Sequence, residues 1–196
     1  MTEDVTNDST GVENRPYHHG NLREALVTKG LKVLAQTKSD DFSLREVARS
    51  VGVSATSIYR HFPDKQAYIE ALCDEGSKML AAIQRDVMAS AGGGQEGLDA
   101  TGLAFVRFAL DNPALFRLMF RARPSGMSYG DGDSPAMQEL VSNVSTLLPD
   151  DATAQERNIR ALHAWSVVRG VAMLVLEGQI PDDDELILAV IRTPHP

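Results

Sequence analysis

The feature that most constrains this chain is a glycine set between two short segments of apolar periodicity, in the sequence LREVARSVGVSATSIYRH from Leu44 to His61. Ala48 is the fifth residue of this segment, Gly52 the ninth and Ile58 the fifteenth. A small residue such as Ala48 lets two helices cross closely, and a glycine permits the sharp turn between them. The spacing therefore predicts a helix-turn-helix, a motif that lays its second helix in the major groove of DNA.

Helix-start and helix-stop residues surround this segment. Ser43 stands three residues before Glu46, the spacing of a capping box. Ser54 is expected to cap the next helix, and Pro63 with Asp64 to end that helix and begin a long one. The helices expected in this half of the chain span residues 21–36, 44–51, 54–62 and 65–91.

The second half of the chain also carries helical patterns and contains no convincing strand. The sequence GGGQEG at 92–97 predicts a linker, because three consecutive glycines are costly to hold in a helix. Residues 122–133, rich in Gly, Pro, Ser and Asp, predict a loop. Helices are expected at residues 98–110, 113–121, 134–148, 151–176 and 182–191, so the expected fold class is all-α.

The sequence around the helix-turn-helix resembles the N-terminal pattern of the TetR family of one-component regulators. The resemblance covers Tyr17 to Leu72, in the stretches YHHGNLREAL and FSLREVARSVGVSATSIYRHFPDKQAYIEAL. It implies that the third helix lies in the major groove, with some side chains facing base edges and others holding phosphates. The implied base-facing residues are Ala55, Thr56 and Ser57, the implied phosphate-binding residues are Tyr59, His61 and Lys65, and Arg60 reaches either a base or the backbone.

The chemistry of these residues and the distribution of charge agree with that role. The hydroxyls of Thr56 and Ser57 can donate or accept hydrogen bonds at base edges. Tyr59 is expected at the surface near the phosphates, whereas Phe62 is expected in the core. Residues 15–70 carry nine basic and six acidic side chains, although the whole chain has a net charge of −8. The basic charge is therefore concentrated where DNA phosphates would bind.

Two histidines before the first helix allow a metal site as an alternative, which we do not favour. His18 and His19 could act together with His61, but no cysteine or carboxylate stands at a ligand spacing nearby. We expect the two histidines, with Arg15 and Tyr17, to form either an arm near the DNA backbone or the packed start of the first helix.

Enzyme chemistry is not expected of this chain. It lacks a Gly-rich phosphate loop, a G-x-S-x-G elbow and a cluster of metal ligands, and we expect no cofactor. The single cysteine, Cys73, has no partner for an intrachain disulfide, which suits the reducing cytoplasm. Residues 1–16 are expected to form a disordered acidic tail rather than a secretory signal. Arg169 interrupts the long apolar segment near the C-terminus, so no membrane span is expected.

The C-terminal part resembles the TetR-type C-terminal domain marked by a Trp-His-Gly signature, in the segments FVRFALDNPALFRLMF and AWSVVRGVAMLVLEG. This chain departs from the signature, because Arg169 stands where the pattern has a histidine before the glycine. Aromatic and methionine side chains in this part predict a pocket for a mainly apolar effector, with core packing as the alternative for each of them. An ion pair with Glu177 or a neighbouring acidic residue is the alternative role for Arg169. The pocket residues expected are Phe105, Phe108, Phe116, Met119, Phe120, Trp165 and Met173, with Arg107, His163 or Arg169 as polar anchors.

The expected helix over residues 161–176 is apolar on nearly every side, so a second surface must cover it. A partner subunit could supply that surface through this helix and the last one, in a two-fold interface of four helices. Val171 and Ile187 are therefore expected at the interface of a homodimer.

The sequence thus predicts an acidic tail over 1–16, a helix-turn-helix domain over 17–64 and a ligand-binding and dimerisation domain over 65–193. The resemblance implies a homodimeric transcriptional repressor that a small, mainly apolar effector releases from palindromic operator DNA. Activation of transcription, or regulation without a small-molecule effector, are the alternatives on the same fold.

Overall fold

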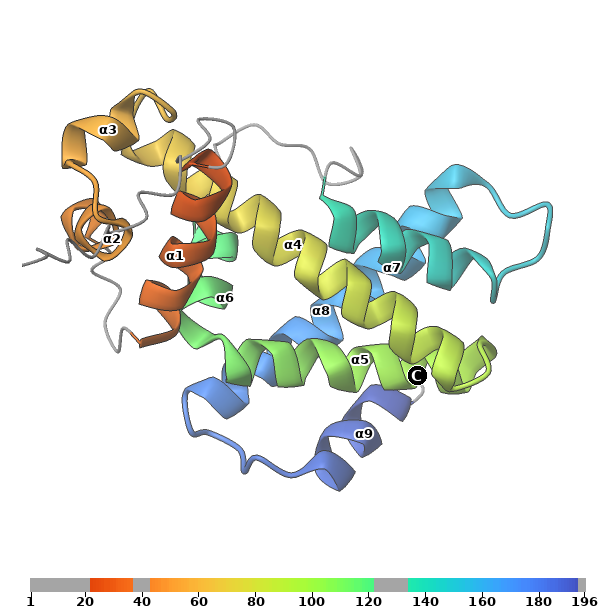
Figure 1. Cartoon of the computed structure of the whole chain (residues 1–196). Coiled ribbons are helices and arrows are strands. Elements are labelled where there is room, and N and C mark those ends of the chain that lie inside the picture. The colour runs from red at the N-terminus through yellow and green to blue at the C-terminus, as the bar shows by residue number, and fades with distance from the viewer. Residues whose placement is uncertain (1–21, 37–42, 122–133, 194–196) are drawn as a thin grey trace, which may run out of the picture.

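The structure, a computed structural model, describes residues 22–36, 43–121 and 134–193. The described residues form nine helices and no strand, which confirms the expected all-α fold class. The helices are α1 (Leu22–Gln36), α2 (Leu44–Val51), α3 (Ala55–Tyr59), α4 (Lys65–Ser90), α5 (Gly94–Asp111), α6 (Pro113–Arg121), α7 (Pro135–Ser145), α8 (Ala154–Leu176) and α9 (Asp184–Arg192). In Figure 1, α1 to α3 lie together at one end of the molecule, and the long α4 leads from them to the remaining helices. The predicted acidic tail and the predicted loop over 122–133 lie outside the described residues.

The turn between α2 and α3 has the geometry that the sequence predicts. Gly52 has a φ of 77°, and its N–H donates to the carbonyl of Arg49 at 3.1 Å. Ser54 caps α3, because its Oγ accepts a hydrogen bond from the N–H of Ser57 at 3.2 Å. α3 ends at Tyr59, three residues earlier than the sequence predicts. The predicted capping box of α2 is wrong, since the side chain of Ser43 makes no capping hydrogen bond.

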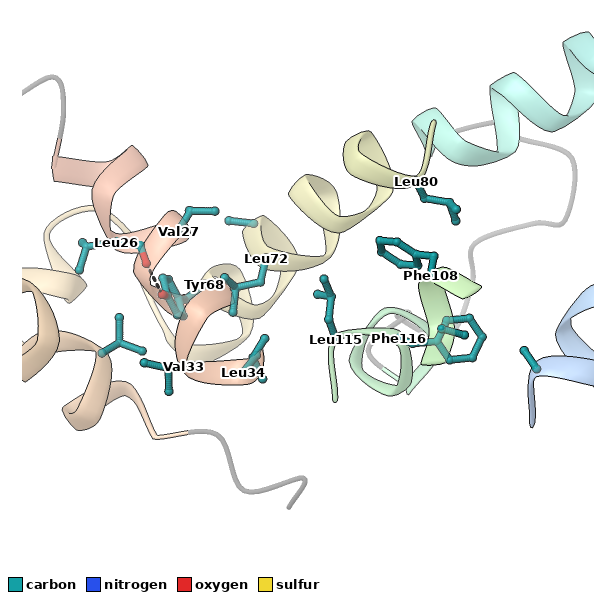
Figure 2. Close-up of a cluster of buried hydrophobic side chains, with 14 of the residues drawn as sticks. Leu26, Val27, Val33, Leu34, Tyr68, Leu72, Leu80, Phe108, Leu115 and Phe116 are labelled. Atoms are coloured by element: carbon teal, nitrogen blue, oxygen red, sulfur yellow. Dashed lines mark hydrogen bonds between the residues drawn. The ribbon is translucent and has the colours of Figure 1, made fainter. Parts of the chain in front are cut away.

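A fully buried tyrosine of α4 joins this helix to α1 through a hydrogen bond. The Tyr68 hydroxyl donates to the carbonyl oxygen of Leu26 at 2.6 Å, as Figure 2 shows. A Cβ on Gly30 would lie only 2.1 Å from that hydroxyl, so α1 needs a glycine where the tyrosine meets it. The ring of Phe62 packs edge-on against Tyr68 at 4.8 Å between centroids, which confirms Phe62 as a core residue. Burial raises the pKa of the Tyr68 hydroxyl well above its ordinary value.

The predicted linker over 92–97 is mostly helical. Only Gly92 and Gly93 form the turn after α4, and α5 begins at Gly94. The physical reason lies in the contact between the two helices, because a Cβ on Gly97 would lie 2.4 Å from the sulfur of Met88. A glycine in this helix therefore marks close packing of α5 against α4 rather than a flexible connection.

The starts of α7 and α8 follow two capping signals. Ser134 caps α7, which spans Pro135–Ser145 where the sequence predicts a helix over 134–148. α8 begins at Ala154 rather than Asp151, because Thr153 and Glu156 form a complete capping box. Hydrogen bonds donated by Thr153 lower the pKa of the Glu156 carboxyl. The T-x-x-E spacing that encodes this box is visible in the sequence.

One cluster of buried apolar side chains runs from α1 through α4, α5 and α6 to α8 and α9, and Figure 2 shows part of it. A smaller cluster formed by Leu140, Val144 and Ala161 lies between α7 and α8. α4 contributes Tyr68 to the part of the core around α1 and Leu80 to the part around α5. The division of the chain at residues 64 and 65 stays a prediction, since the core is continuous across it.

α8 has an unusual balance of composition and burial. Among the described helices it is the one that is long and apolar enough to cross a membrane by length and composition alone, with a mean hydropathy of 1.4 over 18 residues. Only 22% of that segment is buried within the protomer. By itself this is weak evidence for a membrane, because a helix that packs against protein has the same composition.

Replacing the buried tyrosine by phenylalanine should destabilise the fold. Tyr68→Phe removes the hydrogen bond to Leu26 and keeps the ring, so we expect the free energy of unfolding to fall by about 1 kcal/mol. Urea denaturation followed by circular dichroism measures it. The matched control is Tyr59→Phe, which removes a hydroxyl at the surface. Equal stability of Tyr68→Phe and wild type would contradict the role given to this hydrogen bond.

Candidate DNA-binding helix and effector cavity

α3 presents a polar outer face and is anchored by one apolar residue. Ile58 is fully buried, and Ala55 packs against the core with part of its surface exposed. Thr56 is exposed, and Tyr59 is 50% exposed. Tyr59 is thus a surface aromatic residue, as expected, and its contact with phosphate stays a prediction. Within α3, Thr56 and Tyr59 are therefore the members of the expected set whose side chains are exposed.

The remaining predicted DNA-binding residues differ in their accessibility. Arg60 and Lys65 are exposed, and His61 is half-buried. The Ser57 hydroxyl lies 2.9 Å from that of Ser54, so it takes part in capping α3. A base contact by Ser57 would have to share this hydroxyl with the cap.

α2 adds two basic side chains that the sequence analysis did not single out. Arg45 and Arg49 are exposed and lie one helical turn apart. In a helix-turn-helix the first helix crosses the DNA backbone, so these guanidiniums have the placement of phosphate ligands. The signal that could have identified them is their spacing of four residues on the helix before Gly52. The predicted arm lies outside the described residues, since it consists of Arg15, Tyr17, His18 and His19. Among the residues that the structure describes, no group of three His, Cys, Asp or Glu side chains could hold a metal ion.

A cavity of about 950 Å³ lies among α4, α5, α6, α7, α8 and α9. Four of the predicted pocket residues line it: Phe105, Met119, Phe120 and Trp165. Phe108, Phe116, Arg169 and Met173 do not, so for these four the prediction of a lining role is wrong. Phe108 and Phe116 are buried in the core, because they project from faces of α5 and α6 that other helices cover.

The aromatic residues of the cavity wall form one connected cluster. Between ring centroids, Phe120 lies 6.0 Å from Trp165 and 6.3 Å from Phe105. Behind the wall, the buried Phe116 packs edge-on against Phe120 at 4.6 Å and against Phe105 at 5.6 Å. The guanidinium of Arg169 lies over the rings of Phe120 and Trp165, at 4.8 and 5.5 Å from their centroids. Such cation–π contacts are favourable when they are shielded from water. Arg169 therefore packs against the aromatic wall from outside the cavity.

The other polar anchors also depart from expectation. Among the described residues, Arg169 forms an ion pair neither with Glu177 nor with another acidic side chain, so that alternative is wrong as well. Arg107 forms ion pairs with Asp182 and Asp184 outside the cavity, and the hydrogen bond that its guanidinium donates to Asp184 raises the pKa of that guanidinium. His163 is the predicted anchor that lines the cavity.

One end of the cavity carries polar groups that the sequence analysis missed. Asp99 accepts hydrogen bonds from Gln95 at 2.7 Å and from Arg192 at 3.0 Å. Gln84 is buried in the same wall, and its Oε1 has no hydrogen-bond partner. The spacing of Gln95 and Asp99 on one helix is visible in the sequence, but Arg192 lies too far along the chain to be paired with them from spacing.

Cys73 also lines the cavity. Burial raises the pKa of its thiol to about 12, and the carboxylates of Asp74 and Glu70 act in the same direction. The thiol therefore stays protonated near neutral pH and does not have the thiolate character of a nucleophile.

Comparison with protein families identifies both halves of the chain. Residues 26–72 match the family model described as bacterial regulatory proteins of the tetR family. Residues 98–193 match the model described as a tetracyclin repressor-like C-terminal domain. The first match contains the whole helix-turn-helix, and the second contains α6 to α9 and most of α5.

Solved structures share the same fold over nearly the whole chain. A protein of unknown function from Rhodococcus sp. RHA1 is 29% identical, with a TM-score of 0.71 over 91% of this chain and 95% of that one. A tetR-family transcriptional regulator from Streptomyces coelicolor is 20% identical, with a TM-score of 0.63 over 93% of this chain and 79% of that one. The multidrug binding protein EbrR, solved with imidazole, is 17% identical, with a TM-score of 0.59 over 89% and 96%.

The two matches account for the helix-turn-helix at one end of the molecule and the helical bundle with its cavity at the other. Regulators of this kind bind operator DNA and small-molecule effectors, typically as dimers. The chain belongs to the TetR family, whose members are DNA-binding transcriptional regulators and not enzymes.

Proposed function

We propose that this regulator is a cytoplasmic repressor whose homodimer leaves a palindromic operator when a small, mainly apolar effector fills the cavity among α4 to α9. The observation that carries the proposal is the contact of α4 and α6 with both functional regions. Both helices line the cavity, and both pack against α1 of the DNA-binding end. A ligand that displaces either helix therefore acts on α1, which packs against α2, and α2 in turn packs against α3.

The contact between α4 and α6 is tight enough to transmit such a displacement. A Cβ on Gly76 would lie 2.9 Å from the sulfur of Met119 and 3.1 Å from a methyl carbon of Leu115. Met119 and Phe120 also line the cavity. An effector shifts the equilibrium only by its differential affinity for the two positions of these helices. Close packing supports a discrete shift rather than gradual deformation.

Exposed apolar side chains on α8 and α9 support the homodimer interface. Ile159 is 56% exposed, and Leu174, Leu186 and Val190 are exposed as well. Gly170 is exposed on the same helix as Ile159, with open space where its Cβ would stand, so a second helix could approach closely there. A two-fold arrangement of these two helices would cover the apolar surface of α8 that the protomer leaves open.

The residues chosen for the interface from sequence alone need correction. Val171 and Ile187 are buried within the protomer, because their side chains face α5 and the core. Substitutions at these two positions would test folding rather than dimerisation. The exposed Leu174 is the appropriate position on α8.

Operator binding should depend on Lys65 and Thr56 in different ways. Lys65→Ala should weaken binding to all sequences, because it removes a phosphate contact. It should also reduce the magnitude of the salt slope, the slope of log affinity against log salt concentration, by about 1. Thr56→Ala should alter base preference, since a base contact is worth about 1–3 kcal/mol of discrimination. Fluorescence anisotropy on duplexes selected from a random pool measures both. Lys78→Ala, on α4 and ion-paired with Glu75, is the control. An unchanged affinity and salt slope for Lys65→Ala would contradict the proposed docking.

Dimerisation should be lost when a charge is placed on the exposed apolar face of α8. Leu174→Asp should give a folded monomer that no longer binds a full operator, because two recognition helices about 34 Å apart are needed for successive major grooves. Sedimentation velocity at micromolar protein concentration measures the oligomeric state. Ile83→Asp places the same charge on an exposed isoleucine of α4 and should stay dimeric. A monomeric wild-type protein would refute the interface.

Filling the cavity should release the operator. N-phenyl-1-naphthylamine is a neutral aromatic dye that can accept energy from Trp165, the only tryptophan in the chain and a residue of the cavity wall. We expect energy transfer on binding and an operator affinity reduced about 5- to 150-fold at saturation. Binding of the dye with tighter operator binding would favour an activator, and binding with no effect would contradict the coupling.

A further inference from the structure

The end of the cavity beside the first turns of α5 and the last turn of α9 contains a buried carboxylate. The Asp99 side chain is 8% exposed and forms an ion pair with Arg192, whose side chain is 57% exposed. Both residues line the cavity. A buried carboxylate is costly unless it is paired, and here its cation comes from a side chain that lies largely in water.

Asp99 has acceptor capacity left for a ligand. An ionised carboxylate offers about four acceptor positions, and Gln95 and Arg192 occupy one on each oxygen. Gln84, buried in the same wall, has an amide oxygen without a partner. Gly97 on α5 packs against Met88 on α4, and the two helices run in opposite directions. Asp99 follows Gly97 by two residues and Gln84 precedes Met88 by four, so the two side chains lie at nearly the same level, within about one helical turn. This end of the cavity therefore has acceptor capacity that the hydrogen bonds of Asp99 and Gln84 leave unfilled.

The other charged groups of the cavity wall do not oppose a cation at this end. Glu70, Asp74 and Arg160 line the cavity but are exposed, so solvent screens them. Away from Asp99, the wall is apolar along α5 and α8, with Phe105, Trp165 and Val168. Between Cys73 and Gln84 the cavity follows about 16 Å of α4, enough for an extended apolar chain.

We infer that the effector is an amphiphilic amine, whose ammonium group pairs with Asp99 in place of Arg192 and whose apolar part lies along the aromatic wall. The inference rests on the proposed function of the cavity and names the chemical class of its ligand. An ammonium carries three donors, which suits a carboxylate with free acceptor positions beside an unpartnered amide oxygen. Arg192 then turns into water, and α9 loses its ion pair with α5. The cavity end is thereby coupled to a helix of the proposed dimer interface.

Three probes with the same dodecyl chain test the head group: dodecylamine, dodecanol and dodecanoate, each used below the concentration at which it forms micelles. Affinities come from Trp165 fluorescence and isothermal titration calorimetry at neutral pH, where the amine is protonated. We expect dodecylamine to bind about 10-fold more tightly than dodecanol, because a charge-assisted hydrogen bond replaces a neutral one. Dodecanoate should bind most weakly.

Two substitutions move the preference in opposite directions. Asp99→Asn keeps the size of the side chain and removes its charge, so the preference for the amine over the alcohol should disappear. Arg192→Gln removes the competing cation and should strengthen binding of the amine. Asp86→Asn makes the same chemical change on an exposed residue of α4 outside the cavity and should bind like wild type. If Asp99→Asn fails to fold, Arg192→Gln still tests the inference, because this variant is expected to bind the amine more tightly and misfolding would not produce that result.

The outcomes separate this inference from the proposed function. Binding of all three probes with equal affinity, or with dodecanoate the tightest, overturns the inference and leaves the cavity as an effector site. Weaker binding of the amine to Arg192→Gln also overturns it. If no probe changes the fluorescence of Trp165 or gives heat, and the aromatic dye also fails to bind, the cavity itself is not the effector site and the proposed function fails with it.

Discussion

The position of the recognition helix depends on the contact of Tyr68 with α1. Its hydroxyl fills the space left by Gly30 and donates to the carbonyl of Leu26, and its ring packs on Phe62 just after α3. α1, α4 and the segment that follows α3 are thus joined at one buried side chain. Because packed interiors do not deform continuously, a shift of α4 must carry the DNA-binding end with it. In the proposed switch, the cavity acts on the DNA-binding end through this contact and through the packing of α6 on α1 and α4.

The cavity owes its shape to different forces at its two ends. An aromatic stack with Arg169 behind it holds the apolar wall, and Gly102 lets Ile191 and Val168 approach α5 closely. The opposite end is held by the pairing of Asp99 with Arg192 across two helices. Arg169, which stands where the family pattern has a histidine, thus contacts the aromatic wall without lining the cavity itself.

Much of the fold could be predicted because its signals are local. Gly52, Ser54 and Asp64 act within a few residues of their own positions, and each does in the structure what its residue type favours. The errors at helix ends have local causes too. Gly94 to Gly97 were assigned to a linker since glycine disfavours helix, whereas the contact of Gly97 with Met88 needs a residue without a side chain.

The helix order, the helix-turn-helix, the surface position of Tyr59 and the existence of an aromatic cluster could be predicted from sequence, because caps, glycines and apolar periodicity are properties of neighbouring residues. The packing of the helices places Phe105 and Phe120 at a cavity and Phe108 and Phe116 against other helices, and it covers Val171 within the protomer. The same holds for the pairing of Asp99 with Arg192, which are 93 residues apart. Periodicity tells which face of a helix is apolar, but whether that face meets a neighbouring helix, a cavity or a second subunit depends on how distant helices pack against it.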